Sequence, residues 1–127
     1  MTTSFLNIKN ETKGRPPRLP FVSIKNKILG KNYDLSLSFI SSQKQRSINS
    51  KYRGLNKSTN ILSFSLSSNS GEILIDLSKA KREAPIFNMS YSQFIKYLVI
   101  HGMLHLKGFE HSSTMERQEE KYLKIFS

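Results

Sequence analysis

The sequence contains no cysteine and no tryptophan, and it has only three histidines in 127 residues. Without cysteine the chain can form no disulfide, no thiolate nucleophile and no cysteine-bound zinc site, so any metal must be held by histidine or carboxylate side chains. The sequence also lacks an apolar run of about 18 residues, the length that crosses a bilayer. Its first residues contain no apolar signal-peptide core, so we expect a cytoplasmic protein without membrane contact.

Acidic side chains are scarce as well: nine Asp and Glu stand against twenty Lys and Arg, for a formal net charge of +11. The imbalance lies in the first half, because residues 1–60 contain twelve basic and two acidic side chains, whereas residues 61–127 contain eight and seven. A field of one sign attracts a polyanion, and nucleic acid is the expected partner. A solvated lysine-rich surface is the alternative that charge alone leaves open.

Hydrophobic periodicity predicts one α+β domain over residues 1–127. Alternating patterns predict strands over residues 4–9, 35–39, 59–66 and 72–77. The sequence SSNSG between the last two is typical of a hairpin loop. Helical spacing predicts helices over residues 19–29, 42–53, 91–106 and 113–125. Strands and helices mixed early in the chain, with helices late, favour helices packed on a small sheet.

All three histidines lie within the eleven residues HGMLHLKGFEH, residues 101–111. His101 and His105 are four apart on a predicted helix, so their imidazoles project from one face. Gly108 stands where a helix commonly ends in a left-handed residue, which would let the chain turn and present His111 to the same point. The pattern H-x3-H-x5-H therefore predicts a three-histidine metal site with a fourth position for water. Histidines that pack against the core or cap the helix are the structural alternative.

The histidine spacing coincides with the metzincin protease signature H-E-x-x-H-x-x-G-x-x-H. In those proteases a glutamate after the first histidine is the general base, whereas here that position is Gly102, which has no side chain to take a proton. Glu110 lies beyond the predicted helix end and is not an evident replacement. The metal scaffold is thus expected without the peptidase base, and a metalloprotease becomes the weaker hypothesis.

Residues 101–111 resemble the H-G-x-L-H-L-x-G-[YF]-[DE]-H signature of the YbeY family, metal-dependent bacterial endoribonucleases that act in ribosomal RNA maturation. Residues 48–64, INSKYRGLNKSTNILSF, resemble the family segment L-N-x-x-Y-R … T-[DN]-V-L-S-F. Residues 71–75, GEILI, resemble its G-[DE]-I-x-I strand, and residues 115–120 are similar to its acidic C-terminal helix. Together these blocks cover most of residues 48–122.

The resemblance implies a small mixed four-stranded sheet with the histidine-bearing helix packed against it. It implies one zinc ion per chain, bound by His101, His105 and His111. These three histidines would also be catalytic, together with a functional arginine, Arg53, near the metal. The implied activity is phosphodiester hydrolysis by a zinc-dependent, single-strand endoribonuclease in small-subunit rRNA maturation and ribosome quality control. The implied partners are single-stranded rRNA and the small ribosomal subunit or its proteins.

The chemistry of these residue types suits that activity. Zinc with an open position acidifies a bound water and polarises a phosphate oxygen, and the guanidinium of Arg53 matches two phosphate oxygens. The sequence leaves two nucleophiles open: metal-activated water without a protein base, or an RNA 2′-hydroxyl. A non-catalytic assembly factor, in which zinc only stabilises the fold, is the second hypothesis. Further candidates, each with a purely structural alternative, are Lys51 and Lys57 for phosphates, Tyr52, Tyr91 and Phe109 for base stacking, and Ser63 and Glu72 for orienting ligands.

Overall fold

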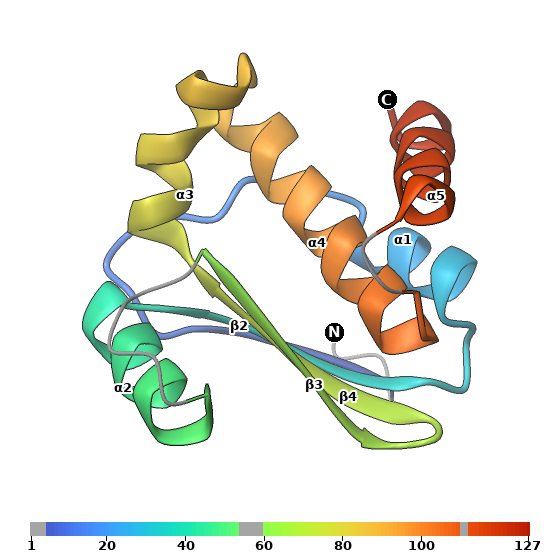
Figure 1. Cartoon of the computed structure of the whole chain (residues 1–127), viewed down its shortest axis with the longest axis horizontal. Helices are drawn as coiled ribbons and strands as arrows, with labels where there is room; N and C mark the ends of the chain where they lie inside the picture. Colours follow the sequence, from blue (N-terminus) through green and yellow to red (C-terminus); the bar gives the residue numbers. More distant parts are fainter. Residues whose placement is uncertain (1–4, 54–59, 110–111) are drawn as a thin grey trace.

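The computed structural model describes residues 5–53, 60–109 and 112–127, with side chains for all of these except residues 52 and 53. Their strands form one mixed sheet in the order β1-β2-β4-β3 (Figure 1). The strands are β1 (Leu6–Asn10), β2 (Asp34–Ile40), β3 (Ile61–Ser67) and β4 (Ser70–Asp76). β1, β2 and β4 are parallel, whereas β3 pairs antiparallel with β4 across the predicted hairpin. The α+β class and the mixed four-stranded sheet are confirmed for the described residues.

The helices cover the two faces of the sheet unequally (Figure 1). The main core lies on one face, where β2 and β4 pack against α1 (Phe21–Ile28), α3 (Leu77–Glu83) and α4 (Tyr91–Lys107). α5 (Ser113–Ile125) packs on α4 and adds Met115 and Tyr122 to this core. α2 (Ser42–Arg53) covers a smaller apolar cluster of Ile40, Leu62 and Leu74 on the opposite face. Within the described residues, no helix is long and apolar enough to cross a membrane.

α4 is the central helix, and its ends are fixed by local hydrogen bonds. Ser90 caps its start: the Ser90 hydroxyl accepts from the Gln93 backbone N–H at 3.1 Å, and the Gln93 side chain accepts from the Ser90 N–H at 2.9 Å. Its buried stripe includes Ile95, Leu98 and Val99, and each such side chain contributes roughly 1.5–3 kcal/mol when removed from water. The helix ends at Gly108, whose φ of 111° is left-handed, as the sequence predicts.

One helix is absent from the sequence-based expectations. The predicted strand over residues 72–77 ends at Asp76, and Leu77 already belongs to α3. The cause is the Asp76 carboxylate, which accepts a hydrogen bond from the Lys79 N–H at 3.0 Å and so caps the helix start. A short 3-10 helix, Ala84–Phe87, then leads toward α4. Because Ile73, Ile75 and Leu77 keep the period of two past Asp76, the alternation conceals this boundary.

Candidate active site

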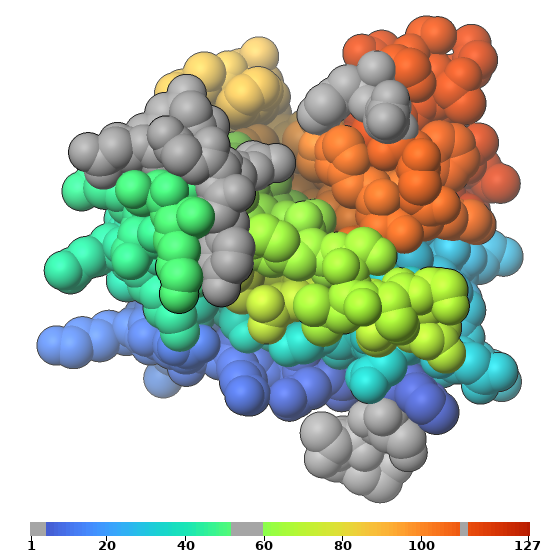
Figure 2. Space-filling view, turned by 60° about the horizontal axis from the view of Figure 1, so that its bottom comes forward, coloured from blue at the N-terminus to red at the C-terminus, as the bar shows by residue number. Residues whose placement is uncertain are grey.

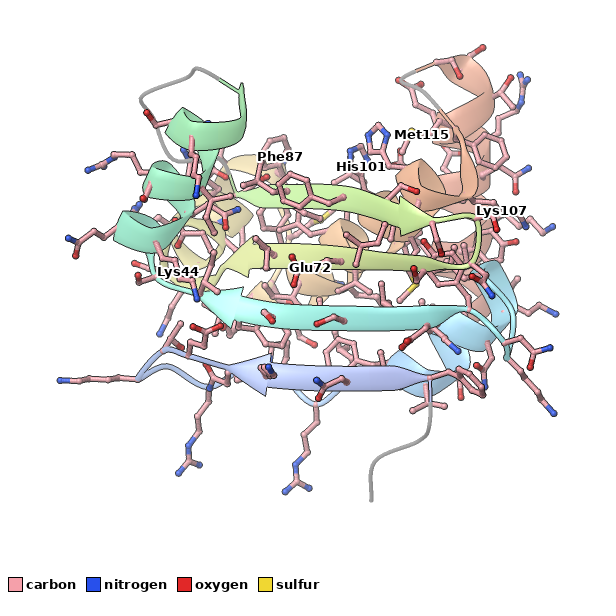
Figure 3. The ribbon with its side chains drawn as sticks, turned by 90° about the horizontal axis from the view of Figure 1, so that it is seen from below. Lys44, Glu72, Phe87, His101, Lys107 and Met115 are labelled. Carbon is pink, nitrogen blue, oxygen red and sulfur yellow. The ribbon has the colours of Figure 1, made fainter. Side chains whose placement is uncertain are left out.

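His101 and His105 lie side by side on α4, as the sequence predicts. Their rings meet edge to face, with centroids 4.7 Å apart. They line a cleft of about 580 Å³ between α4 and β3, which we call the histidine cleft. Figure 3 places His101 beside the β3 edge of the sheet, and Figure 2 shows the side of the molecule on which β3 and α4 meet. The remaining wall residues are Asn60, Ile61, Ser63, Ser65 and Leu106.

Gly102 lets α4 lie directly against the sheet at this point. A Cβ atom on Gly102 would come within 2.9 Å of the Ile61 Cδ1 and 3.0 Å of the Ile73 Cδ1 and the Ser63 Oγ. Even one carbon atom would force these neighbours to shift, so a glutamate has no room. The position that holds the general base of metzincins is therefore buried in the helix–sheet contact. This geometry counts against the metalloprotease hypothesis.

His101 is held from behind by a buried carboxylate. Its Nδ1 forms a hydrogen bond with the Oε2 of Glu119 on α5. Glu119 is only 6% exposed. A carboxylate that accepts from Nδ1–H fixes the ring orientation and the tautomer, which leaves the Nε2 lone pair available to a ligand. Glu119 thus gives His101 the environment that proteins commonly give to a metal-binding imidazole.

A second aromatic ring packs against this pair. The Tyr97 ring lies one turn before His101, with centroids 5.8 Å apart. Burial first, and then the charges of Glu119 and Glu116, raise the pKa of Tyr97. The two carboxylates among these causes place negative charge on the side of α4 that α5 covers.

Glu119 is the site residue that the sequence-based reasoning missed. A signal for it exists, because Met115, Glu119 and Tyr122 are the buried residues of α5 and follow helical spacing. A glutamate within an apolar stripe must find a partner when the stripe is buried. The partner, however, comes from another helix, and the sequence does not say which one.

Two predicted site residues lie outside the described part of the structure. His111 falls between Phe109 and Ser112, and the side chain of Arg53, the last residue of α2, is likewise not described. Among the described side chains, no group of three metal-ligating residues is present. The three-histidine ligand set and the role of Arg53 therefore stay predictions.

Of the further candidates, Ser63 lines the histidine cleft, whereas Glu72 does not. In β4, Ile73 faces the main core, so its neighbour Glu72 points to the opposite face, where Figure 3 labels it. Phe109 packs against the core, and Tyr91 lies at the far end of α4 from the histidines. Lys57 and the Tyr52 side chain lie outside the described residues.

Comparisons with known proteins identify one family that this chain is similar to. The family model described as Endoribonuclease YbeY matches residues 19–127. Curated relatives named Endoribonuclease YbeY include one from Desulforamulus reducens, 32% identical over 76% of this chain and 71% of its own length. Another, from Mycoplasmopsis synoviae, is 35% identical over 75% of this chain and 68% of its own length.

The fold also matches a solved structure, the solution structure of TM1509 from Thermotoga maritima. The TM-score is 0.66 at 24% identity, over 94% of this chain and 87% of that one. The family match thus includes the whole of α4 and α5, the helices that hold His101, His105 and Glu119. The chain belongs to the YbeY endoribonuclease family.

Proposed function

We propose that this protein is a zinc-dependent endoribonuclease that cleaves single-stranded segments of ribosomal RNA during small-subunit maturation. The observation that supports it most is the pair of adjacent imidazoles in an open cleft, one of them held by a buried carboxylate. Family membership supplies the reaction class, because the relatives are named endoribonucleases. We propose ribosomal RNA and the small subunit as partners on the same ground.

The described residues fit a zinc ion. Neutral imidazole nitrogens are ligands that zinc prefers, and the Glu119 contact leaves the Nε2 of His101 available. His101 and His105, together with His111, would hold the ion. A zinc ion there would supply a Lewis acid for the phosphoryl oxygens and acidify a coordinated water.

The chain's own residues would orient the substrate. Ser63 and Ser65 follow the period of two along β3, so both face the histidine cleft with hydroxyl groups suited to sugar and phosphate oxygens. The Asn60 amide lies at the cleft end and is itself positioned by a 2.9 Å hydrogen bond to Glu83. We propose that the Arg53 guanidinium clamps the scissile phosphate, whose charge it matches with two parallel donors.

The test is cleavage of a labelled single-stranded rRNA fragment by the purified full chain. Chelation should abolish cleavage, zinc should restore it, and Arg53→Ala should reduce it by at least about tenfold if the guanidinium clamps the phosphate. Arg46→Ala is the matched control, because it removes the same guanidinium group from an exposed position on the same helix. A chain that binds one zinc ion yet leaves RNA intact would instead favour the non-catalytic assembly factor.

A further inference from the structure

A second cleft, of about 600 Å³, opens at the carboxyl ends of the parallel strands. Its walls are the loop after β1 (residues 11–15), the β2–α2 junction (residues 40–42), the first turns of α3 and the Tyr91 side chain. None of its lining residues lines the histidine cleft. Ligands of open α/β sheets bind at this edge, where the strands end and the loops converge. We call it the basic cleft.

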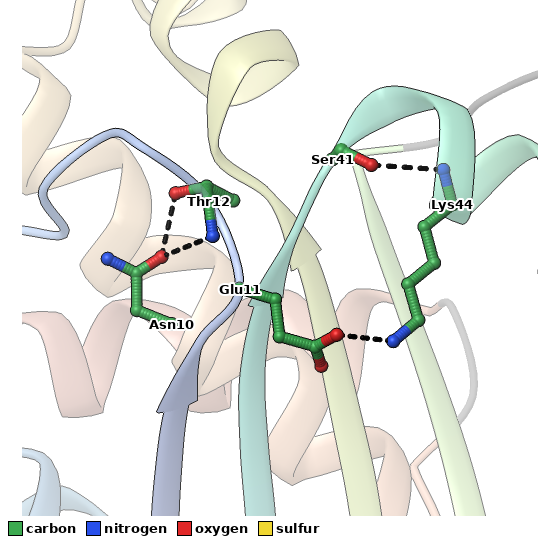
Figure 4. Close-up of polar contacts among 5 residues, drawn as sticks. All are labelled: Asn10, Glu11, Thr12, Ser41 and Lys44. Atoms are coloured by element: carbon green, nitrogen blue, oxygen red, sulfur yellow. Dashed lines mark hydrogen bonds and ion pairs between the residues drawn. The ribbon is translucent and has the colours of Figure 1, made fainter.

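The charged side chains of this cleft are mostly cationic. Lys13, Arg15 and Lys81 line it, and no carboxylate among the described residues forms an ion pair with any of the three. Its one acidic side chain, Glu11, is neutralised by an ion pair with Lys44 of α2 (Figure 4). Three cations without counter-charges repel one another in a shared cleft, and an anion would relieve that repulsion.

The cationic loop is held in place by side-chain hydrogen bonds (Figure 4). The Asn10 side-chain Oδ1 accepts from the backbone N–H and the hydroxyl of Thr12, at 3.0 and 2.7 Å. The Asn10 amide donates to the Gly14 carbonyl at 2.8 Å, and the Tyr91 hydroxyl donates to the Arg15 carbonyl at 3.0 Å. Because the loop is fixed in advance, less conformational entropy is lost when a ligand binds.

The cleft also borders the start of α2, the positive end of a twelve-residue helix. Ser42, its first residue, has a hydroxyl enclosed by protein and without a hydrogen-bond partner among the described residues. Rotation of this hydroxyl toward a ligand would therefore break no hydrogen bond to those residues. This donor adds to the three cations and points to an anion with several oxygens.

We propose that the basic cleft binds a phosphate group of the RNA strand, outside the segment that enters the histidine cleft; this inference rests on the proposed function. The site binds a phosphate and does not stack a base, because the Lys81 ammonium lies over the Tyr91 ring, 5.9 Å from its centroid. Recognition is therefore independent of sequence. An RNA strand long enough to reach both clefts binds more tightly than a short one.

The test compares two triple variants of the full chain that remove the same charge. The cleft variant removes the three cations of the basic cleft and combines Lys13→Ala, Arg15→Ala and Lys81→Ala. The control variant removes three exposed lysines elsewhere and combines Lys27→Ala, Lys31→Ala and Lys124→Ala. Binding of a 20-nucleotide and a 6-nucleotide single-stranded RNA is measured over a salt series with chelator present. We expect the cleft variant to bind the long RNA at least about tenfold more weakly, with a salt slope lower by about 2. The control variant should lose about threefold or less.

A single variant guards against misfolding. Ser78→Asp places a negative charge in the cleft at the first turn of α3, where the N-terminal end of a helix favours an acidic residue. The Arg82 guanidinium already donates to the Ser78 hydroxyl at 2.9 Å. It should keep the fold and weaken binding of the long RNA several-fold. Equal losses for the two triple variants, or unchanged binding by Ser78→Asp, would overturn the proposal.

Two further measurements are needed. One distinguishes an RNA phosphate from a free nucleotide as the ligand, and the other distinguishes failure of the basic-cleft proposal from failure of the proposed activity. Adenosine monophosphate is titrated while the amide signals of residues 11–15 are followed by NMR; micromolar binding that RNA does not displace would assign the cleft to a free nucleotide and overturn the RNA assignment. Zinc-dependent RNA cleavage by the unmodified chain is measured separately. If that chain cleaves RNA while the two triple variants bind RNA equally well, the basic-cleft proposal fails and the proposed activity stands. If it does not cleave while the variants differ, the cleft stands and the proposed activity falls.

Discussion

The histidine cleft and the basic cleft have similar volumes, about 580 and 600 Å³, but their polar groups are held in different ways. In the first, two imidazoles project from the central helix and one is fixed by Glu119, which is 6% exposed. In the second, exposed lysine and arginine side chains project from a loop and a short helix. Rigid, buried support suits chemistry, which depends on sub-ångström placement, whereas exposed cations suit binding, which depends on charge.

The largest effect is expected from His105→Ala, which removes a proposed zinc ligand and should lower the RNA cleavage rate by roughly 10³-fold, or about 4 kcal/mol of transition-state stabilisation. The measurement is the single-turnover rate with zinc present, beside Lys107→Ala as an exposed control on the same helix. Equal rates for His105→Ala and the unmodified chain would remove the histidine cleft from the reaction.

Gly102→Glu should destabilise the fold by about 3 kcal/mol or more, because it forces a charge into the contact between α4 and β3. Gly102→Ala should change stability by only about 1 kcal/mol, since a gain in helix propensity offsets the movement of the two isoleucine ends. Urea unfolding measures both. A stable, folded Gly102→Glu chain would contradict the packing described here and revive the metalloprotease hypothesis.

Glu119→Gln should weaken zinc binding by about tenfold, while Lys121→Ala, an exposed change on the same helix, should not affect it. The cause is the loss of the negative charge behind His101, although an amide oxygen can still accept from Nδ1–H. Competition with a chromophoric chelator gives the affinity, and ¹⁵N NMR of the imidazole gives the tautomer. Unchanged zinc affinity would mean that Glu119 serves packing alone.

The smallest effect concerns the rim of the basic cleft. Glu11→Gln breaks the exposed ion pair with Lys44 and should cost less than about 1 kcal/mol of stability. RNA binding should become about two- to threefold tighter, because the cleft loses its one carboxylate. Weaker RNA binding by this variant would show that Glu11 positions the loop instead of opposing the ligand.

The sequence predicts most of the fold because its signals are local. Alternation in residues 35–39, helical spacing in residues 91–106 and the stop at Gly108 all reflect contacts within a few residues. The boundary at Asp76 is not predicted, because Leu77 continues the period of two of the strand beyond the capping residue. The role of Glu119 is not predicted because its partner is 18 residues away on another helix. The basic cleft is not predicted because it joins four separate segments of the chain.

The most direct test of this division between the clefts is steady-state cleavage of one long single-stranded rRNA fragment by two variants. Glu119→Gln and the triple variant of Lys13, Arg15 and Lys81 are assayed at the same zinc concentration. We predict that the first lowers kcat more than it changes KM, and that the second raises KM more than it changes kcat. If the triple variant loses mainly kcat, or if Glu119→Gln changes only KM, chemistry and binding are not divided between the two clefts.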